Sequence, residues 1–471
     1  MADRADGHWP ERLRTESSVR SGVKAPSFES LPRAKARTAR GSLEVREINV
    51  RMEVVTPIFG GGVQTRSVDE VDVIRAPSVR GHLRCWWRAL YAAQCASAEE
   101  LYERESALWG RAATDAGGRS AVEIRIDVEH VGQTDNSDIR LYPSRQGQAT
   151  PGAYALWPAR AETRGSTPAP RRQPGTQFQL TLRAAGTSEA EIRNALRAWI
   201  LFGGYGGRTR RGLGSVKVLG DQGSWLPVAA TRDALENLFG LDVLVSPTKA
   251  PGDSPWLGGA ALQVGTADRD AMRAWTTALD WLKEFRQGTS GPQGDRAREP
   301  GTGKPQPQRP SISNWPEADK VRRIKNKTNA HAPRHNETPA WPRAGFGLPM
   351  IGQFQRTDRN DNRDAYDEPD PFELRWRTGN FEHDRLASQL IVKALPLADG
   401  TFVPCALWLN RAYPAGGEVI LKNTNNSQAP FDRLVANGDT ARFSALANKA
   451  NLRQAFLDWL HAKYQTTVVA P

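Results

Sequence analysis

The order of strand-like and helix-like segments over residues 48–219 is the feature that most restricts the fold. Ile48, Val50, Met52 and Val54 occupy every second position, as on a strand with one buried face. Without its connections, the stretch follows the order β-α-β-β-α-β, which is that of a ferredoxin-like antiparallel sheet with two helices on one face. We expect strands at 48–54, 71–74, 122–128, 178–182 and 215–219, and helices at 78–90, 97–110 and 188–202.

The second half of the chain is less regular but contains the same kinds of segment. Helical patterns cover 267–287 and 444–460, and two strand segments at 390–397 and 403–409 are joined by a turn, as in a hairpin. We therefore predict an α+β protein with a flexible basic arm at 1–40, an N-terminal domain at 41–225 and a C-terminal α+β domain at 226–471. The Gly, Pro and polar residues near 288–310 predict a disordered loop in the second domain.

Charge and cysteine content restrict the partner and the compartment. The 64 Lys and Arg residues exceed the 52 Asp and Glu residues, which gives the 471-residue chain a formal net charge of +12 and predicts a polyanionic partner. No run of 18 apolar residues is present, and the N-terminal residues lack the apolar region of a secretory signal. Cys85, Cys95 and Cys405 are too few for a disulfide framework. We expect a cytoplasmic protein.

The strongest local signal is the glycine-rich and arginine-rich segment 203–217, between a predicted helix and a predicted strand. Glycines let a backbone approach phosphates closely, and amides and guanidinium groups supply donors. The segment has no Gly-Lys-Ser/Thr and follows a helix, so it is neither a Walker loop nor a dinucleotide fingerprint. The alternative is an exposed turn with solvated arginines. The candidate RNA-binding residues here are Gly204, Gly206, Gly207, Arg208, Arg210, Arg211, Gly212, Gly214 and Lys217.

A second basic signal lies on the predicted helix that begins near Ser78, the expected N-cap. Arg80, Arg84 and Arg88 recur every four residues and therefore share one face of the helix. Together with Arg75 and Ser78 they lie near a helix N-terminus, which suits phosphate. The alternative is a solvated basic face. We expect Trp86 and Trp87 to belong to the core.

No residue pattern indicates catalysis or a metal. His82 has only basic neighbours in the sequence, so a structural role is favoured over that of a general base. His331 and His335 have a metal-like spacing, but Pro333 disrupts the helix that such a pair requires. We predict no catalytic residue, no metal and no cofactor.

Several of these segments resemble one known family. Residues 75–88 resemble the first-helix motif of the RAMP superfamily of CRISPR-associated proteins, in the form carried by subunit one of the type III-B (Cmr) effector complex. Residues 56–61 are similar to the opening strand and loop of that family, and residues 204–214 to its glycine-rich loop. Residues 343–349 and 385–390 resemble later elements, where Gln389 departs from the usual Ser-Pro. The resemblance implies tandem ferredoxin-like (RRM-like) RAMP domains with long loop insertions.

The same resemblance implies a function. It indicates a non-catalytic RNA-binding subunit of an RNA-guided type III-B effector complex in antiviral defence. Such a subunit contacts guide or target single-stranded RNA near the guide 3′ end and adjoins other RAMP subunits. One alternative is a metal-independent endoribonuclease that processes CRISPR transcripts, with His82 or another histidine as its base. Another is a structural subunit whose basic surface binds acidic protein partners.

Overall fold

The computed structural model describes residues 44–62, 66–111, 117–141, 147–162, 166–185, 188–287, 315–327, 338–354, 369–425, 427–431 and 444–471. The predictions for the arm at 1–40 and for the loop near 288–310 lie outside these residues, as do those for His331 and His335. Residues Val45–Pro471 form one compact unit, to which the following description refers.

The first sheet has the strand order β3-β6-β1-β7, and every neighbouring pair is antiparallel. The alternation predicted for the first strand is observed in β1, where Ile48, Val50 and Met52 are buried and the residues between them face outward. This alternation gives the sheet one apolar face and one polar face. Its strands are β1 (Val45–Val54), β3 (Glu123–His130), β6 (Gln177–Ala185) and β7 (Val216–Leu219). The helices of this half are α1 (Ala76–Tyr91), α2 (Ala98–Trp109), α3 (Ala153–Leu156), α4 (Glu189–Phe202) and α5 (Arg232–Phe239).

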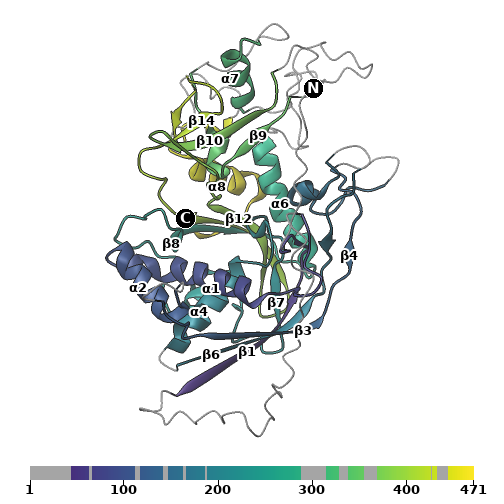
Figure 1. Cartoon of the computed structure of the whole chain (residues 1–471), viewed down its shortest axis with the longest axis vertical. Helices are drawn as coiled ribbons and strands as arrows, with labels where there is room; N and C mark the ends of the chain where they lie inside the picture. Colours follow the sequence, from purple (N-terminus) through teal and green to yellow (C-terminus); the bar gives the residue numbers. More distant parts are fainter. Residues whose placement is uncertain are drawn as a thin grey trace, which may run out of the picture. The chain divides into compact units, whose positions relative to one another are not determined.

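Helices α1 and α4 cover the buried face of this sheet (Figure 1). Each has an apolar stripe at helical spacing, with Leu83 and Trp87 on α1 and Leu196 and Trp199 on α4. All four side chains belong to one core cluster with Leu180 of β6. The predicted placement of Trp86 and Trp87 in the core is confirmed.

The second sheet has the order β12-β13-β8-β16, which is the same permutation of chain order as in the first sheet. It is again antiparallel, and its helices again follow its first and third strands along the chain. Its strands are β8 (Trp256–Val264), β12 (Leu390–Pro396), β13 (Phe402–Asn410) and β16 (Thr467–Ala470), and its helices are α6 (Ala271–Gln287) and α8 (Leu452–Tyr464).

The two sheets and their helices are stacked in layers (Figure 1). Ile391, Cys405 and Leu407 on one face of the second sheet share the core that contains α1 and α4. Val392 and Ala406, on its other face, pack with Trp275 of α6 and other residues of α6 and α8. The face of the second sheet that carries no helices of its own is therefore covered by α1 and α4.

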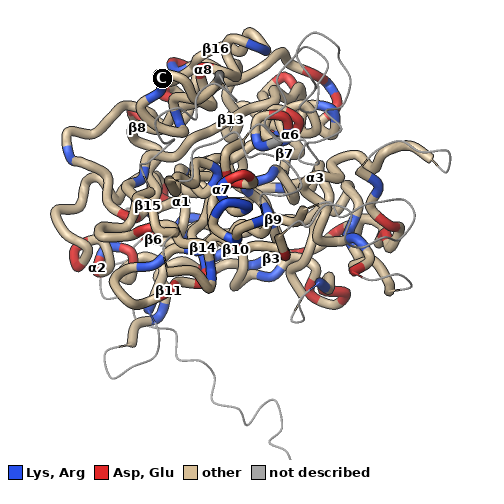
Figure 2. The backbone as a smooth tube through the Cα atoms, turned by 90° about the horizontal axis from the view of Figure 1, so that it is seen from above, with Lys and Arg blue, Asp and Glu red and all other residues tan. Residues whose placement is uncertain are grey.

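Two smaller sheets flank these layers. One has the order β2-β5-β4, and the other has the order β11-β10-β14-β15 with β9 also paired to β10. Figure 2 shows β10, β11 and β14 close together. The elements are β2 (Ile58–Phe59), β4 (Thr134–Asp135), β5 (Arg171–Arg172), β9 (Met350–Gly352), β10 (Phe372–Thr378), β11 (Phe381–His383), β14 (Gly417–Leu421), β15 (Ala429–Pro430) and α7 (Glu317–Ile324).

Two local predictions are wrong. Residues 71–74 form no strand, because the Asp69 carboxylate accepts the N–H groups of Val71 and Asp72 and bends the chain, leaving Val71 97% exposed. Ser78 is not the N-cap of α1, since the helix begins at Ala76. In contrast, the predicted Ser97 cap of α2 is confirmed by its 3.2 Å bond from the Glu100 N–H. No helix within the described ranges is long and apolar enough to cross a membrane.

Candidate nucleic-acid interface

The predicted arginine face of α1 is present, but its side chains have partners. Arg84 Nε and Arg88 Nη1 lie 2.6 and 2.7 Å from the same Glu105 carboxylate oxygen on α2. Glu105 is only 4% exposed. Arg80 Nη1 donates to Ser120 Oγ at 2.5 Å and to the Val122 carbonyl at 2.9 Å. One carboxylate thus neutralises half of the charge of Arg84 and Arg88.

The N-terminus of α1 meets Tyr205 in the glycine-rich segment. The Arg75 amide donates to the Tyr205 hydroxyl at 2.9 Å, and Ser78 also hydrogen-bonds this hydroxyl. Burial raises the pKa of Tyr205 above its ordinary value. Arg75 Nε lies 3.8 Å from an Asp72 carboxylate oxygen and remains partly exposed. The two predicted sites are therefore in direct contact.

Residues 203–214, here called the glycine loop, owe their glycines to close packing of the backbone. At Gly214, where φ is +65°, a Cβ would lie 1.8 Å from the Tyr205 carbonyl oxygen. At Gly212, where φ is +77°, a Cβ would lie 2.4 Å from the Trp275 ring. At Gly204 it would lie 2.8 Å from the Leu213 carbonyl oxygen. Only glycine fits such positions.

Several amides of the glycine loop are already used within the chain. Gly207 N donates to the Phe59 carbonyl at 2.6 Å, and Gly214 N donates to the Pro57 carbonyl at 2.9 Å. The Gly212 amide donates to Thr209 at 2.9 Å. Gly206, at φ +88°, would bring a Cβ to 3.0 Å from the Ile58 side chain. Donors for an anion must therefore come chiefly from side chains of this loop.

Lys393 of β12 holds the start of the glycine loop. Its buried Nζ donates to the carbonyls of Ile200 and Gly203, at 3.0 and 2.8 Å, at the C-terminal end of α4. Burial lowers the pKa of Lys393 to about 7 and raises that of the neighbouring Cys405 thiol to about 12. A neutral amine keeps two N–H donors, which match the two carbonyls.

The loop arginines point toward the second half of the chain. Arg210 Nη1 donates to the Ser388 carbonyl, and Arg211 donates to the carbonyls of Leu390 and Phe346 at 3.1 and 3.3 Å. Arg208 is exposed. Lys217 lies apart from them on β7, with its Nζ 3.5 Å from a Glu53 carboxylate oxygen. Within the predicted set, the structure thus groups Arg208, Arg210 and Arg211.

Two further arginines, which the sequence analysis missed, complete what we call the arginine cluster: Arg208, Arg210, Arg211, Arg286 and Arg411. Burial, together with the charges of Arg286, Arg208 and Arg210, lowers the pKa of Arg211 to about 9. Burial also lowers the pKa of Arg210, as does Arg411. Arg286 lies 5.5 Å from the Phe346 ring centroid. No sequence spacing links Arg286 and Arg411 to the glycine loop.

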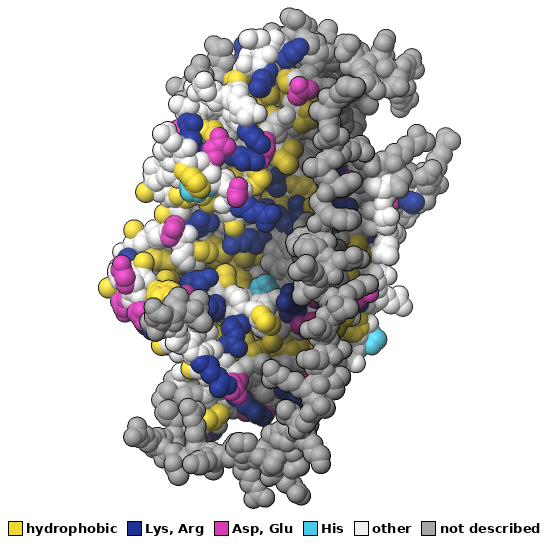
Figure 3. Space-filling view, in the orientation of Figure 1, with side chains coloured by type: hydrophobic (Ala, Val, Ile, Leu, Met, Phe, Trp, Pro, Cys, Tyr) yellow, Lys and Arg dark blue, Asp and Glu magenta, His cyan; other side chains and the backbone are white. Residues whose placement is uncertain are grey.

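The arginine cluster lacks charge compensation. Among the described residues, none of its five guanidinium groups forms an ion pair with a carboxylate. Asp253 acts on Arg411 electrostatically without pairing with it. Figure 3 shows Lys and Arg side chains gathered across the middle of this face, with few acidic side chains among them. Like charges held together without counter-ions attract an anion.

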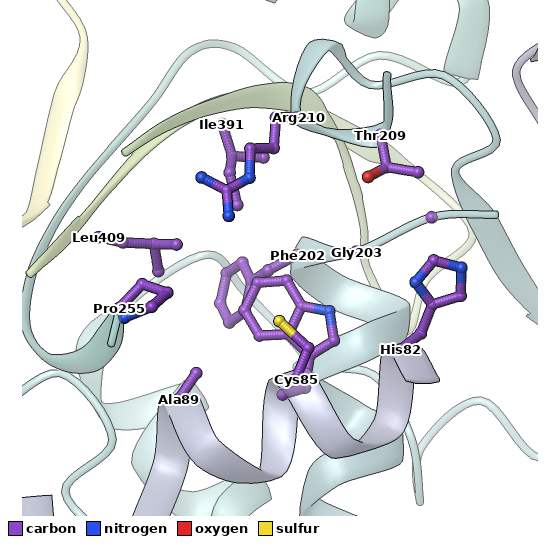
Figure 4. Close-up of a pocket in the computed structure, with 12 residues that line it drawn as sticks. His82, Cys85, Ala89, Phe202, Gly203, Thr209, Arg210, Pro255, Ile391 and Leu409 are labelled. Carbon is purple, nitrogen blue, oxygen red and sulfur yellow. The ribbon is translucent and has the colours of Figure 1, made fainter. Parts of the chain in front are cut away.

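A small cavity of about 70 Å³ lies beside the cluster. His82 and Cys85 of α1 face it from one side and Arg210 from the other (Figure 4). The His82 ring lies 6.0 Å from that of Trp199 in a nearly parallel arrangement, and burial lowers the pKa of His82. His82 is therefore neutral at pH 7. In the described part of the chain, no three His, Cys, Asp or Glu side chains form a group that could hold a metal.

The open face of the first sheet has a different character. Its arginines and lysine are matched by carboxylates, as in the pairs Arg51–Glu129, Arg183–Glu47 and Lys217–Glu53. Apart from the exposed imidazole of His130 at the end of β3, no aromatic ring lies on the outward positions of β1, β3 and β6. This face lacks the uncompensated charge and the set of rings with which RRM-type sheets bind RNA.

One protein-family model matches part of the chain. Residues 51–217, which contain α1 and the glycine loop, match the model of the RAMP superfamily. The resemblance predicted from the motifs at 75–88 and 204–214 is thus confirmed over the part of the chain that the RAMP model covers. No curated protein matches it.

Among solved structures, the chain is similar to Cmr1 from Pyrococcus furiosus in its apo form. The identity is 17% and the TM-score is 0.45, and the match covers 90% of this chain and 98% of that one. It is also similar to a chain of the type III-B Cmr-beta complex bound to cognate target RNA. There the identity is 10% and the TM-score is 0.39, with 85% of this chain and 99% of that one covered.

Proposed function

We propose that this protein is a non-catalytic RNA-binding subunit of a type III-B CRISPR effector complex, acting in the cytoplasm in antiviral defence. It contacts guide or target single-stranded RNA near the guide 3′ end and adjoins other RAMP subunits. The RAMP match over residues 51–217 supports the family assignment on which this rests. The motifs at 75–88 and 204–214 support the particular subunit.

The proposal includes a tandem ferredoxin-like architecture with domains at 41–225 and 226–471. The equal strand order of the two sheets supports it, since each sheet follows the order β-α-β-β-α-β along the chain. The boundary near residue 225 stays a prediction.

The observation that carries the proposal is the uncompensated arginine cluster. Guanidinium groups bind phosphate bidentately, and an RNA backbone supplies phosphates at regular intervals. Arg208 and Arg286 are the members without a carbonyl partner among the described residues, so they are the first to meet phosphate. Arg75, Ser78, Arg80, Arg84 and Arg88 extend the contact along α1. Such contacts position RNA without reading its bases.

The test uses the double variant Arg208→Gln and Arg286→Gln in the full-length chain. Binding of a labelled single-stranded RNA is measured across a salt series in the presence of EDTA. We expect weaker binding for every RNA sequence and a flatter salt dependence, by about 0.7 in the logarithmic slope for each lost phosphate contact. Arg125→Gln on the open sheet face, where Arg125 pairs with Asp127, is the matched control. An unchanged slope in the double variant contradicts the proposal.

One observation favours a second candidate, the metal-independent endoribonuclease. His82, Cys85 and Arg210 face one cavity, and the lowered pKa of His82 leaves its imidazole free to accept a proton at pH 7. The same binding assay tests it, because the RNA can be examined for cleavage. Cleavage that survives EDTA and is abolished by His82→Ala establishes the enzyme. RNA that stays intact during binding favours the non-catalytic subunit.

A further inference from the structure

Five aromatic rings follow one another across the small sheet that contains β10 and β11. Tyr413 is stacked on Phe431, with ring centroids 5.0 Å apart and planes 4° apart. Phe431 lies 6.1 Å from Trp376, and Trp376 is stacked on His383 at 3.6 Å and 7°. The ring of Phe381 meets that of His383 edge-on at 4.7 Å. We call this set the aromatic strip.

The aromatic strip lies at the surface. Phe381 is 67% exposed, and the other four rings are half-buried. Strand register places the members on β10 and β11 on one face, because Trp376 pairs with His383 and Thr378 pairs with Phe381. Farther along that face of β10, Phe372 and Leu374 are buried in a core cluster. Trp376, Tyr413 and Phe431 pack against this cluster, so the strip extends from the core of this sheet to the exposed ring of Phe381.

The rings are held in place before any ligand arrives. Thr378 Oγ1 and His383 Nε2 are 2.5 Å apart, and this hydrogen bond fixes the imidazole parallel to the Trp376 indole. Stacking on a fixed ring costs a ligand less ordering entropy than stacking on a mobile one.

The strip is continuous with the arginine cluster. Tyr413 is two residues beyond Arg411 and acts on its charge. Arg411 has a buried Nε that no described group accepts, and it also acts on the charge of Arg210. Neighbouring side chains that act on one another electrostatically thus link the glycine loop to Tyr413, and ring contacts continue from Tyr413 to the exposed Phe381.

We propose that the aromatic strip stacks unpaired bases of the single-stranded RNA whose backbone contacts the arginine cluster. Every nucleobase has an aromatic face, and grooves that combine basic side chains with exposed rings bind single strands in this way. The inference rests on the proposed function for the RNA itself. It adds a base-contacting element, which the open face of the first sheet and the buried Trp86 and Trp87 do not provide.

The test changes Phe381, which is exposed enough for replacement without loss of the fold. Phe381→Ala and Phe381→Trp are compared with wild type for binding to a single-stranded RNA that carries 2-aminopurine, followed by anisotropy and fluorescence quenching. Ile351→Ala is the matched control, because Ile351 is 74% exposed in the same sheet but pairs with Glu373 on the opposite face. An RNA of the same length with abasic positions serves as the second ligand.

We expect Phe381→Ala to weaken binding of the base-containing RNA about ten-fold and to reduce quenching. Phe381→Trp should retain both, and Ile351→Ala should behave as wild type. Binding of the abasic RNA and the salt slope should be unchanged, because no phosphate contact is lost. Unchanged binding and quenching in Phe381→Ala overturn the inference, as does an effect confined to assembly with a protein partner.

The two proposals fail separately. If the Arg208→Gln and Arg286→Gln double variant binds RNA with the same salt dependence as wild type, the proposed RNA interface itself is refuted. If the double variant shows the expected flatter salt dependence but Phe381→Ala binds RNA as wild type does, the proposed RNA-binding function stands and only the base-stacking role is refuted.

Discussion

Replacement of Gly214 by alanine tests whether the glycine loop is glycine-rich for the fold or for a ligand. A left-handed conformation costs an L-residue about 1–2 kcal/mol, and Gly214 has φ +65°. The new Cβ would also lie 1.8 Å from the Tyr205 carbonyl oxygen, so the backbone must move. That movement breaks the 2.8 Å bond from Tyr205 N to Gly214 O and the 2.9 Å bond from Gly214 N to Pro57 O. At about 1 kcal/mol each, these raise the expected loss to about 3–4 kcal/mol.

Gly240 offers a matched control. It follows α5 with the same φ of +65°, but a Cβ there meets nothing within 4 Å. Gly240→Ala should therefore cost only the conformational term of about 1–2 kcal/mol. Urea unfolding of both variants, followed by tryptophan fluorescence, measures the difference. Equal losses in the two variants would refute the steric reasoning. A stable Gly214→Ala variant that no longer binds RNA would show that the glycine serves the ligand instead.

Three further predictions concern buried charges and the anchoring of the loop. Burial lowers the pKa of Lys393 from 10.5 to about 7, so the unfolded chain binds more protons than the folded chain between these values. The free energy of unfolding should therefore rise with pH across that window, by at most about 1.4 kcal/mol per pH unit. Urea midpoints measured against pH check this, and Lys393→Met should flatten the rise. Glu105→Gln should lower stability by about 3 kcal/mol in thermal unfolding, because it leaves Arg84 and Arg88 without their shared buried carboxylate, yet it should not weaken RNA binding. Thr56→Val should lower stability by about 1–3 kcal/mol in the same unfolding assay, because Thr56 Oγ1 donates to the Gly212 carbonyl and accepts the Ser215 N–H. A loss no larger than that of an exposed Thr→Val change would contradict this reasoning.

The sequence predicted elements of two kinds: those with one buried face, and the apolar strands β12 and β13, which are buried on both faces but are joined by a recognisable turn. The alternation in β1 and the stripe on α4 follow directly from that burial. Strand β8 is also buried on both faces, so its residues do not alternate. It was missed because Gly258 and Gly259 interrupt its apolar run and no short turn joins it to another strand.

The candidate site was predictable only where its residues are close in sequence. Arg208, Arg210 and Arg211 lie in one glycine-rich segment, which made them visible. Arg286 and Arg411 reach them only through the packing of the second sheet and α6 on the first half. The pairing of Arg84 and Arg88 with Glu105 depends on how α2 packs against α1. The spacing of these residues in the sequence does not predict that packing.

The layered packing has a consequence for the synthesis of the chain. The apolar surface that α1 and α4 turn toward the second sheet is complete once Phe202 has been added, but its cover includes Ile391, Leu407 and Leu409. A nascent chain therefore carries this surface uncovered while about 200 further residues are translated, which takes roughly 10–40 s. During that interval it presents a binding site for chaperones, and a chain that terminates early should aggregate rather than persist as a folded fragment.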